Sequence, residues 1–293
     1  MDLGINFRNF GPSATPENLR GWVRFAEDAG FTIAMTSDHV ALTPDVAETY
    51  PAPFYDPFVT FAWLAAETRA IRLGTTVNVV PLRHPLLTAR LAANVDRFSA
   101  GRFVLGVAPG WSRQEYEALG LDFDARGRAT DECLEIITNA WRADTVSARG
   151  ASYAFEDVAT GPRPAHIPVW VGGAGPPALR RAARFGQAWH PVNARLDWLR
   201  DTGLPALREA AEAIGRPVPR LCPRMQLRIT DRPAHDRMPG TGTFEQVQED
   251  LEAYERLGAD TLVLDTNPDD PHDRRELAVD QRILVTVAER WLR

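Results

Sequence analysis

The chain has 293 residues, of which 44% are hydrophobic and 25% are charged, and its formal net charge is -6. This acidic balance argues against a nucleic-acid partner, and no apolar run reaches the roughly 18 residues of a membrane span. The chain has no lysine, which excludes Schiff-base chemistry and a P-loop lysine, and its first residues lack a targeting signal. We therefore expect a cytoplasmic enzyme with one domain, residues 1–293, that acts on a small molecule without binding a membrane.

Apolar, β-branched runs alternate with amphipathic stretches along the whole chain. The runs that predict strands cover residues 2–7, 32–36, 71–80, 102–107, 169–171, 187–190, 223–229 and 261–264. The predicted helices start at the N-cap residues Thr15, Asp56 and Thr243, cover residues 87–98, 127–141, 175–185 and 196–214, and include a last one through Trp291. About eight strand-then-helix units predict a parallel sheet closed into a single (β/α)8 TIM barrel with insertion loops, an α/β fold.

Two connections are long for such a barrel. Residues 41–55 contain three prolines and are a candidate lid over the barrel mouth. Residues 147–168 form the other insertion, in which residues 151–155 are a candidate edge strand. Cys133 lies on an apolar helical stripe and is expected in the core, and the histidines lack metal-ligand spacing.

The ends of the predicted strands carry the chemistry, because barrel enzymes build their sites there. The residues at these ends are Phe7, Asp38, His39, Thr76, Val77, Asn78, Pro109, Gly110, Trp111, Gly172, Gly173, Ala174, His190 and Arg228. His39 is the sharpest catalytic candidate, since an imidazole exchanges protons near neutral pH beside a ring that gains or loses hydride. The alternative is that His39 closes a loop by bonding Asp38 or backbone, and Asp38 is either an orienting group or an ordinary turn residue.

Glycine-rich and aromatic segments suggest the two sides of a binding cavity. The run Gly172-Gly173-Ala174-Gly175-Pro176 opens a predicted helix, where backbone amides can approach a phosphate, although such turns are also common closures of βα loops. Candidate substrate-side residues are Phe7, Tyr50, Phe54, Trp111, Trp189 and His190. The alternative for the aromatic loop is local packing.

Several motifs follow one another along the chain. They are Asp38-His39, Leu73-Gly74-Thr75 with Val77, Arg83-His84-Pro85, Gly101-Arg102-Phe103 with Leu105-Gly106-Val107, Gly110-Trp111 with Glu115, and Gly172-Gly173-Ala174-Gly175. This ordered set resembles the luciferase-like monooxygenase superfamily, in particular its coenzyme F420-dependent oxidoreductase branch. The resemblance implies hydride transfer between F420 and a small organic molecule, with His39 as the catalytic group. It also implies a cofactor site formed by Asp38, His39, Thr76, Val77, Asn78, Gly110, Gln114, Gly172, Gly173, Ala174, Gly175 and Pro176.

Some details remain open or depart from the family pattern. The resemblance implies a cis peptide at Thr76-Val77 that supports the cofactor ring, and an ordinary buried strand is the alternative. Trp111 stands where related sugar-phosphate dehydrogenases carry an acidic proton donor, and their phosphate-binding lysines are missing, so a sugar phosphate is not expected. The alternative enzyme is an FMN-dependent luciferase-like monooxygenase that uses reduced flavin and O2. A non-catalytic flavin-binding barrel is the alternative of another class, and a homodimer stays open.

Overall fold

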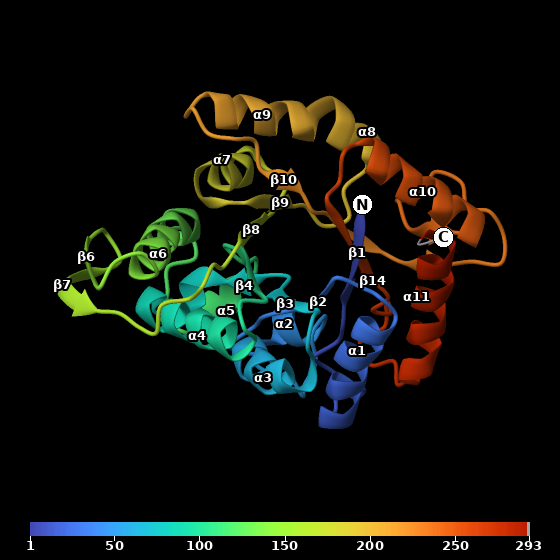
Figure 1. Cartoon of the computed structure of the whole chain (residues 1–293), viewed down its shortest axis with the longest axis horizontal. Helices are drawn as coiled ribbons and strands as arrows, with labels where there is room; N and C mark the ends of the chain where they lie inside the picture. The colour runs from blue at the N-terminus through green and yellow to red at the C-terminus, as the bar shows by residue number, and fades with distance from the viewer. Residues whose placement is uncertain (292–293) are drawn as a thin grey trace.

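The computed structural model describes residues 1–291, which form a parallel barrel surrounded by helices (Figure 1). The strands, in spatial order around the sheet, are β10 (Arg220–Leu221), β9 (Ala188–His190), β8 (Val169–Gly172), β5 (Phe103–Ala108), β3 (Arg72–Thr75), β2 (Ile33–Thr36), β1 (Asp2–Asn6), β14 (Thr261–Asp265) and β11 (Arg224–Gln226). All neighbouring pairs in this order are parallel. The α/β fold expected from the sequence is confirmed.

The two ends of this order belong to one interrupted strand, residues 220–226, which closes the barrel. On one side, the backbone N–H of Cys222 donates to the carbonyl of Trp189 in β9. On the other side, the N–H of Val263 in β14 donates to the carbonyl of Pro223. The segment therefore lies between β9 and β14 and completes the ring of eight strand positions that the sequence predicts.

The helices form the outer layer. They are α1 (Pro16–Asp28), α3 (Pro57–Leu64), α4 (Pro85–Phe98), α6 (Arg126–Ala140), α7 (Pro176–Phe185), α9 (Leu204–Glu212), α10 (Phe244–Arg256) and α11 (Leu277–Trp291), with short α2 (Pro44–Ala47), α5 (Arg113–Ala118) and α8 (Leu196–Trp198). Single turns occur at η1 (Ala65–Glu67), η2 (Val80–Leu82) and η3 (Leu199–Gly203). The expected N-caps are present, since Thr15, Asp56 and Thr243 each accept a backbone N–H, the last in a full capping box.

The structure corrects three strand predictions. The seventh strand begins at Arg220 rather than at 223, and its expected end becomes β12 (Arg228–Ile229), which leaves the barrel to pair with β13 (Thr241–Gly242). In the long connection 147–168, the strand expected at 151–155 begins later, as β7 (Ala154–Ala159). It pairs with β6 (Thr145–Arg149) in an antiparallel hairpin beyond α6 (Figure 1). The third strand, expected over 71–80, is interrupted after Thr75 and resumes as β4 (Asn78–Val79), which pairs with β5.

Apolar side chains form two cores and a third, three-residue cluster of Val79, Leu82 and Tyr116. The larger core lies between the sheet and the helices, and it contains Cys133 as predicted. A smaller cluster fills the barrel interior with Ile33, Met35, Val104, Trp170, Ala188, Cys222 and Val263. Alternation along the strands explains this division, because successive side chains point to opposite faces of a sheet. Within residues 1–291, no helix has the length and apolar character needed to cross a membrane.

Gly106 generates a stability prediction, because β5 passes very close to the interruption of the third strand. A Cβ on Gly106 would lie 1.9 Å from the carbonyl oxygen of Thr75, which is fixed backbone. Gly106→Ala is therefore expected to lower the free energy of unfolding by about 2 kcal/mol or more. Gly172→Ala is the matched control, since its Cβ would have the movable Val77 Cγ1 as nearest neighbour at 3.2 Å and would meet fixed backbone, the Val107 carbonyl oxygen, only at an ordinary contact distance of 3.4 Å. Equal denaturation midpoints for the two variants would contradict this account.

Candidate active site

A cavity of about 650 Å³ lies at the carboxyl ends of the barrel strands. Of the residues proposed from the sequence, Asp38, His39, Tyr50, Thr76, Val77, Pro109, Gly110, Trp111 and Gly173 line it. They come from the ends of four strands, β2, β3, β5 and β8, and from the candidate lid, so distant segments converge as expected. Among the described residues, no group of His, Cys, Asp and Glu is arranged to hold a metal ion.

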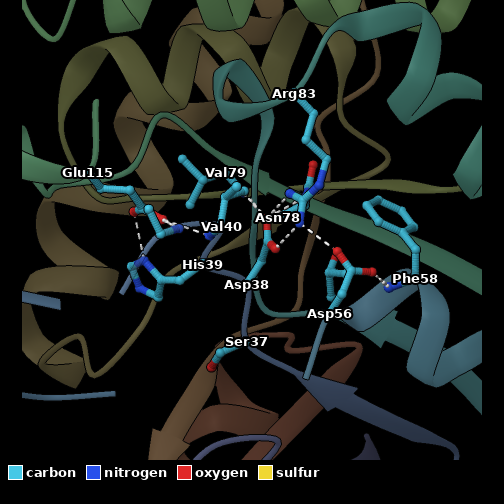
Figure 2. Close-up of polar contacts among 12 residues, drawn as sticks. Ser37, Asp38, His39, Val40, Asp56, Phe58, Asn78, Val79, Arg83 and Glu115 are labelled. Carbon is cyan, nitrogen blue, oxygen red and sulfur yellow. Dashed lines mark hydrogen bonds and ion pairs between the residues drawn. The ribbon is translucent and has the colours of Figure 1, made fainter. Parts of the chain in front are cut away.

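His39 lies on the cavity wall beside a buried carboxylate that the sequence analysis did not assign. Its Nδ1 is 2.8 Å from Oε2 of Glu115, and both side chains are almost fully buried (Figure 2). The other oxygen of Glu115 accepts the backbone N–H groups of Val40 at 2.7 Å and Ala41 at 3.1 Å. Glu115 is the acidic residue of the Gly110-Trp111 motif, and this spacing was the available signal for it.

Asp38 faces away from His39 (Figure 2). It belongs to a network of buried polar contacts that holds the loops around the site, which we call the frame. Its carboxylate has no exposed surface and pairs with both terminal nitrogens of Arg83, at 2.7 and 2.8 Å. It also accepts the Asn78 side-chain N–H and the Val79 backbone N–H, which ties the loop after β2 to β4. These contacts agree with the interpretation of Asp38 as an orienting group, and Asn78 is one of the groups that it holds.

Arg83 extends this frame to the start of α3. Its guanidinium also pairs with Asp56 at 2.7 Å, and Asp56 in turn caps α3 by accepting the N–H groups of Phe58 and Val59. Burial alone would lower the pKa of Arg83, but Asp38 and Asp56 raise it above its usual value. The cation is therefore permanent, and the motif Arg83-His84-Pro85 fixes helix starts, since His84 accepts the N–H of Leu86 at α4.

The peptide between Thr76 and Val77 is cis, at the interruption between β3 and β4. Both residues line the cavity. The Thr76 carbonyl accepts a hydrogen bond from Arg224 at 3.2 Å, and Arg224 pairs with the buried carboxylate of Asp265. From the sequence, Arg228 was the arginine expected at this strand end. The correction to Arg224 follows from the shifted seventh strand, and Arg228 pairs with Asp269 instead.

Aromatic rings flank the imidazole. The ring centroid of His39 is 4.8 Å from that of Tyr50 and 5.8 Å from that of Trp111, and both aromatic residues line the cavity. Burial raises the pKa of the Tyr50 hydroxyl, which therefore keeps its proton. Phe54 lies behind this wall, stacked on Phe10 at 5.9 Å, and does not line the cavity.

Three residues expected on the substrate side lie behind the cavity wall. Phe7 is fully buried and packs edge-on against Phe61. Trp189 is fully buried, and its Nε1 donates to the Gly173 carbonyl at 2.7 Å. They lie there because the register of each strand turns these side chains into the cores rather than toward the mouth.

His190 is the third of these residues. Its Nδ1 donates to the carbonyl of Cys222, so its Nε2 accepts the Thr76 hydroxyl at 2.8 Å. Burial lowers the pKa of His190 to about 4, and the ring is neutral near pH 7. His190 therefore holds Thr76 in place and does not exchange protons with a ligand.

The glycine-rich segment reaches the cavity at one residue. Gly173 lines it with a φ of +100°, which a side chain adopts only with strain. Gly172 is buried against Val77, whereas the segment from Ala174 to Pro176 is exposed outside the cavity, where Pro176 begins α7. Gln114 is likewise exposed on α5 and lies outside the lining.

Known proteins resemble this chain in sequence and in fold. An uncharacterized protein of Mycobacterium tuberculosis is 33% identical over 172 residues, which cover 54% of this chain, and the match spans only 60% of that relative. The F420-dependent glucose-6-phosphate dehydrogenase of Beutenbergia cavernae is 28% identical over 298 residues, covering 99% of this chain and 83% of that enzyme. The monooxygenase RslO1 from Streptomyces bottropensis has the same fold, with a TM-score of 0.80, 21% identity and complete coverage of both chains.

A sequence profile described as luciferase-like monooxygenase matches residues 1–235, which is most of the chain. The expected family is therefore confirmed: the chain belongs to the luciferase-like monooxygenase family.

Proposed function

We propose that the protein is an F420-dependent oxidoreductase that transfers a hydride between the deazaflavin and a small, uncharged organic substrate. The observation that carries this proposal is the His39–Glu115 pair on the wall of a cavity that also exposes the Thr76-Val77 peptide. It supplies one exchangeable proton next to a surface on which a flat ring can lie. The match to an F420-dependent dehydrogenase over 99% of the chain supports the choice of cofactor.

The residues present fit such a cofactor. Thr76 and Val77 would support its ring, and the exposed backbone at Gly173 would receive its phosphate, because a Cβ there would fill the space up to Ala178 at 3.0 Å. A lysine-free chain can meet an anion with backbone amides in this way. The bound deazaflavin would supply or accept the hydride.

The protein's own groups would control the proton and the water. His39 would take a proton from a substrate hydroxyl, or return it to a carbonyl oxygen, as a general base or acid. Tyr50 and Trp111 flank the imidazole and would exclude water from the reacting atoms. Each of these roles belongs to a side chain that lines the cavity.

The charges of the cavity support an uncharged substrate. Both arginines of its lining are engaged within the described part of the chain. Arg224 pairs with Asp265, and Arg8 donates to the carbonyls of Pro271 and Asp273. A phosphate or carboxylate on the substrate would therefore find no uncommitted arginine, in agreement with the absence of lysine.

The choice of cofactor can be tested by binding. Purified protein titrated with F420 and, separately, with FMN should show clearly tighter binding of F420 by fluorescence. Tighter binding of FMN would favour the monooxygenase alternative, and binding of neither would contradict both enzyme assignments. Binding of F420 without turnover of any alcohol or carbonyl substrate would favour the non-catalytic barrel.

His39 should be essential for turnover. We expect His39→Ala to lower turnover with F420 by about a hundredfold or more, the usual effect of losing acid or base assistance. His235→Ala is the matched control, because His235 is exposed and does not line the cavity. Unaltered turnover in His39→Ala, with a normal melting temperature, would leave His39 a purely structural role.

Gly173 should control the affinity for the intact cofactor. Gly173→Val places a side chain at a positive φ and against Ala178, and we expect it to weaken F420 binding more than tenfold, or about 1.4 kcal/mol. Affinity for the phosphate-free ring fragment should change much less. An equal loss for cofactor and fragment would show that the phosphate lies elsewhere.

A further inference from the structure

We propose that Glu115 is a positioning residue that fixes the tautomer of His39, so that Nε2 is the atom that exchanges a proton with the substrate. This inference rests on the proposed function for its chemistry. Its structural part stands on contacts within the protein alone, and it can be tested without any cofactor.

The two oxygens of Glu115 have different partners. Oε1 accepts two backbone N–H groups, from Val40 at 2.7 Å and from Ala41 at 3.1 Å. Oε2 is left for Nδ1 of His39, at 2.8 Å. The carboxylate is 2% exposed, so water does not compete for these sites. The protein therefore dictates which oxygen serves the backbone and which serves the imidazole.

This division decides where the imidazole carries its proton. As an ionised carboxylate, Glu115 only accepts hydrogen bonds, so Nδ1 of His39 must carry a hydrogen. In the neutral ring the lone pair then lies on Nε2, which is the nitrogen left for the cavity that His39 lines. His39 is consequently prepared to receive a proton on the cavity side.

Further contacts keep Glu115 in place. The N–H of Glu115 donates to the Ser112 hydroxyl at 2.9 Å, which caps α5. That hydroxyl donates to Asp45 at 2.7 Å, and Asp45 belongs to α2 in the candidate lid. Glu115 is thus fixed from its own helix, from the residues after His39 and, through Ser112, from the lid.

The chemistry balances as a two-electron oxidation with one proton released. With F420 bound, the deazaflavin would accept the hydride from the substrate carbon, and Nε2 of His39 would accept the proton of the substrate hydroxyl. A carbonyl product and an imidazolium would remain, and the carboxylate of Glu115 would face the positive ring. In the reverse direction, the same proton returns from Nε2 to the carbonyl oxygen.

Glu115→Gln gives a specific test, because an amide is not symmetric. The N–H groups of Val40 and Ala41 require an acceptor, so the amide oxygen must take the place of Oε1. The amide NH2 then faces Nδ1 of His39 and donates to it. Nδ1 can no longer carry a hydrogen, and the proton moves to Nε2. The variant should therefore invert the tautomer of His39 with little change in shape.

The tautomer is read by nitrogen-15 NMR of the imidazoles in cofactor-free protein. The chain has six histidines, and the His39 signals are identified by their loss in His39→Ala. We expect hydrogen on Nδ1 in the wild type and on Nε2 in Glu115→Gln. Glu117→Gln, an exposed position on the same helix, should leave the wild-type tautomer. With F420, Glu115→Gln should lower the rate of substrate oxidation about a hundredfold.

Hydrogen on Nε2 in the wild type, or the same tautomer in wild type and Glu115→Gln, would overturn the inference. The wild-type spectrum keeps the test decisive even where the variant does not fold. Because the spectra need no cofactor, an inverted tautomer supports the role of Glu115 whichever cofactor the titration finds. A failure of F420 binding would count only against the proposed function.

Discussion

A buried ion pair between Asp38 and Arg83 organises the open end of the barrel. It joins the loop after β2 to the interrupted third strand, through Asn78 and Val79, and to the start of α3, through Asp56. Removing one partner would leave the other charge buried, which typically costs about 3–5 kcal/mol. The position of the cavity wall, including the residue that follows Asp38, therefore depends on this one pair.

Asp38 and His39 are adjacent in the sequence but have different roles in the site. Asp38 is bound to a guanidinium that keeps its charge at every physiological pH, so the frame does not change with the proton content of its surroundings. His39 is bound to a carboxylate, Glu115, and lies on the wall of the cavity. Opposite side-chain directions at adjacent positions keep the Asp38–Arg83 ion pair and the His39 ring apart (Figure 2).

Features that depend on residues close in sequence could be predicted. The N-cap residues Thr15, Asp56 and Thr243 correctly predicted the starts of their helices. The rule that barrel sites form at strand ends correctly placed Asp38, His39 and Thr76 at one cavity. The partner of His39 could not be predicted from the sequence, because Glu115 lies 76 positions away and contacts His39 only in the folded barrel.

The direction of side chains on the shortest strands could not be predicted from the sequence either. Trp189 and His190 belong to a strand of three residues, in which no alternation of polar and apolar residues marks the face that turns inward. The seventh strand is interrupted at Pro223 and ends earlier than expected. Arg224, rather than the expected Arg228, therefore lies at the cavity.

The anchoring of Val40 and Ala41 on Glu115 has a consequence for how such a protein can change. The first residues after His39 are fixed by the same carboxylate that holds the ring, and Asp45 is fixed through Ser112. The rest of the connection carries Tyr50 and Phe54 and is tied to the loop after β1 instead, because Gly11 and Asn9 bond to the backbone of residues 51, 53 and 55. New substrate preferences can therefore be selected at Tyr50 and Phe54 while the contacts of the His39–Glu115 pair are inherited unchanged.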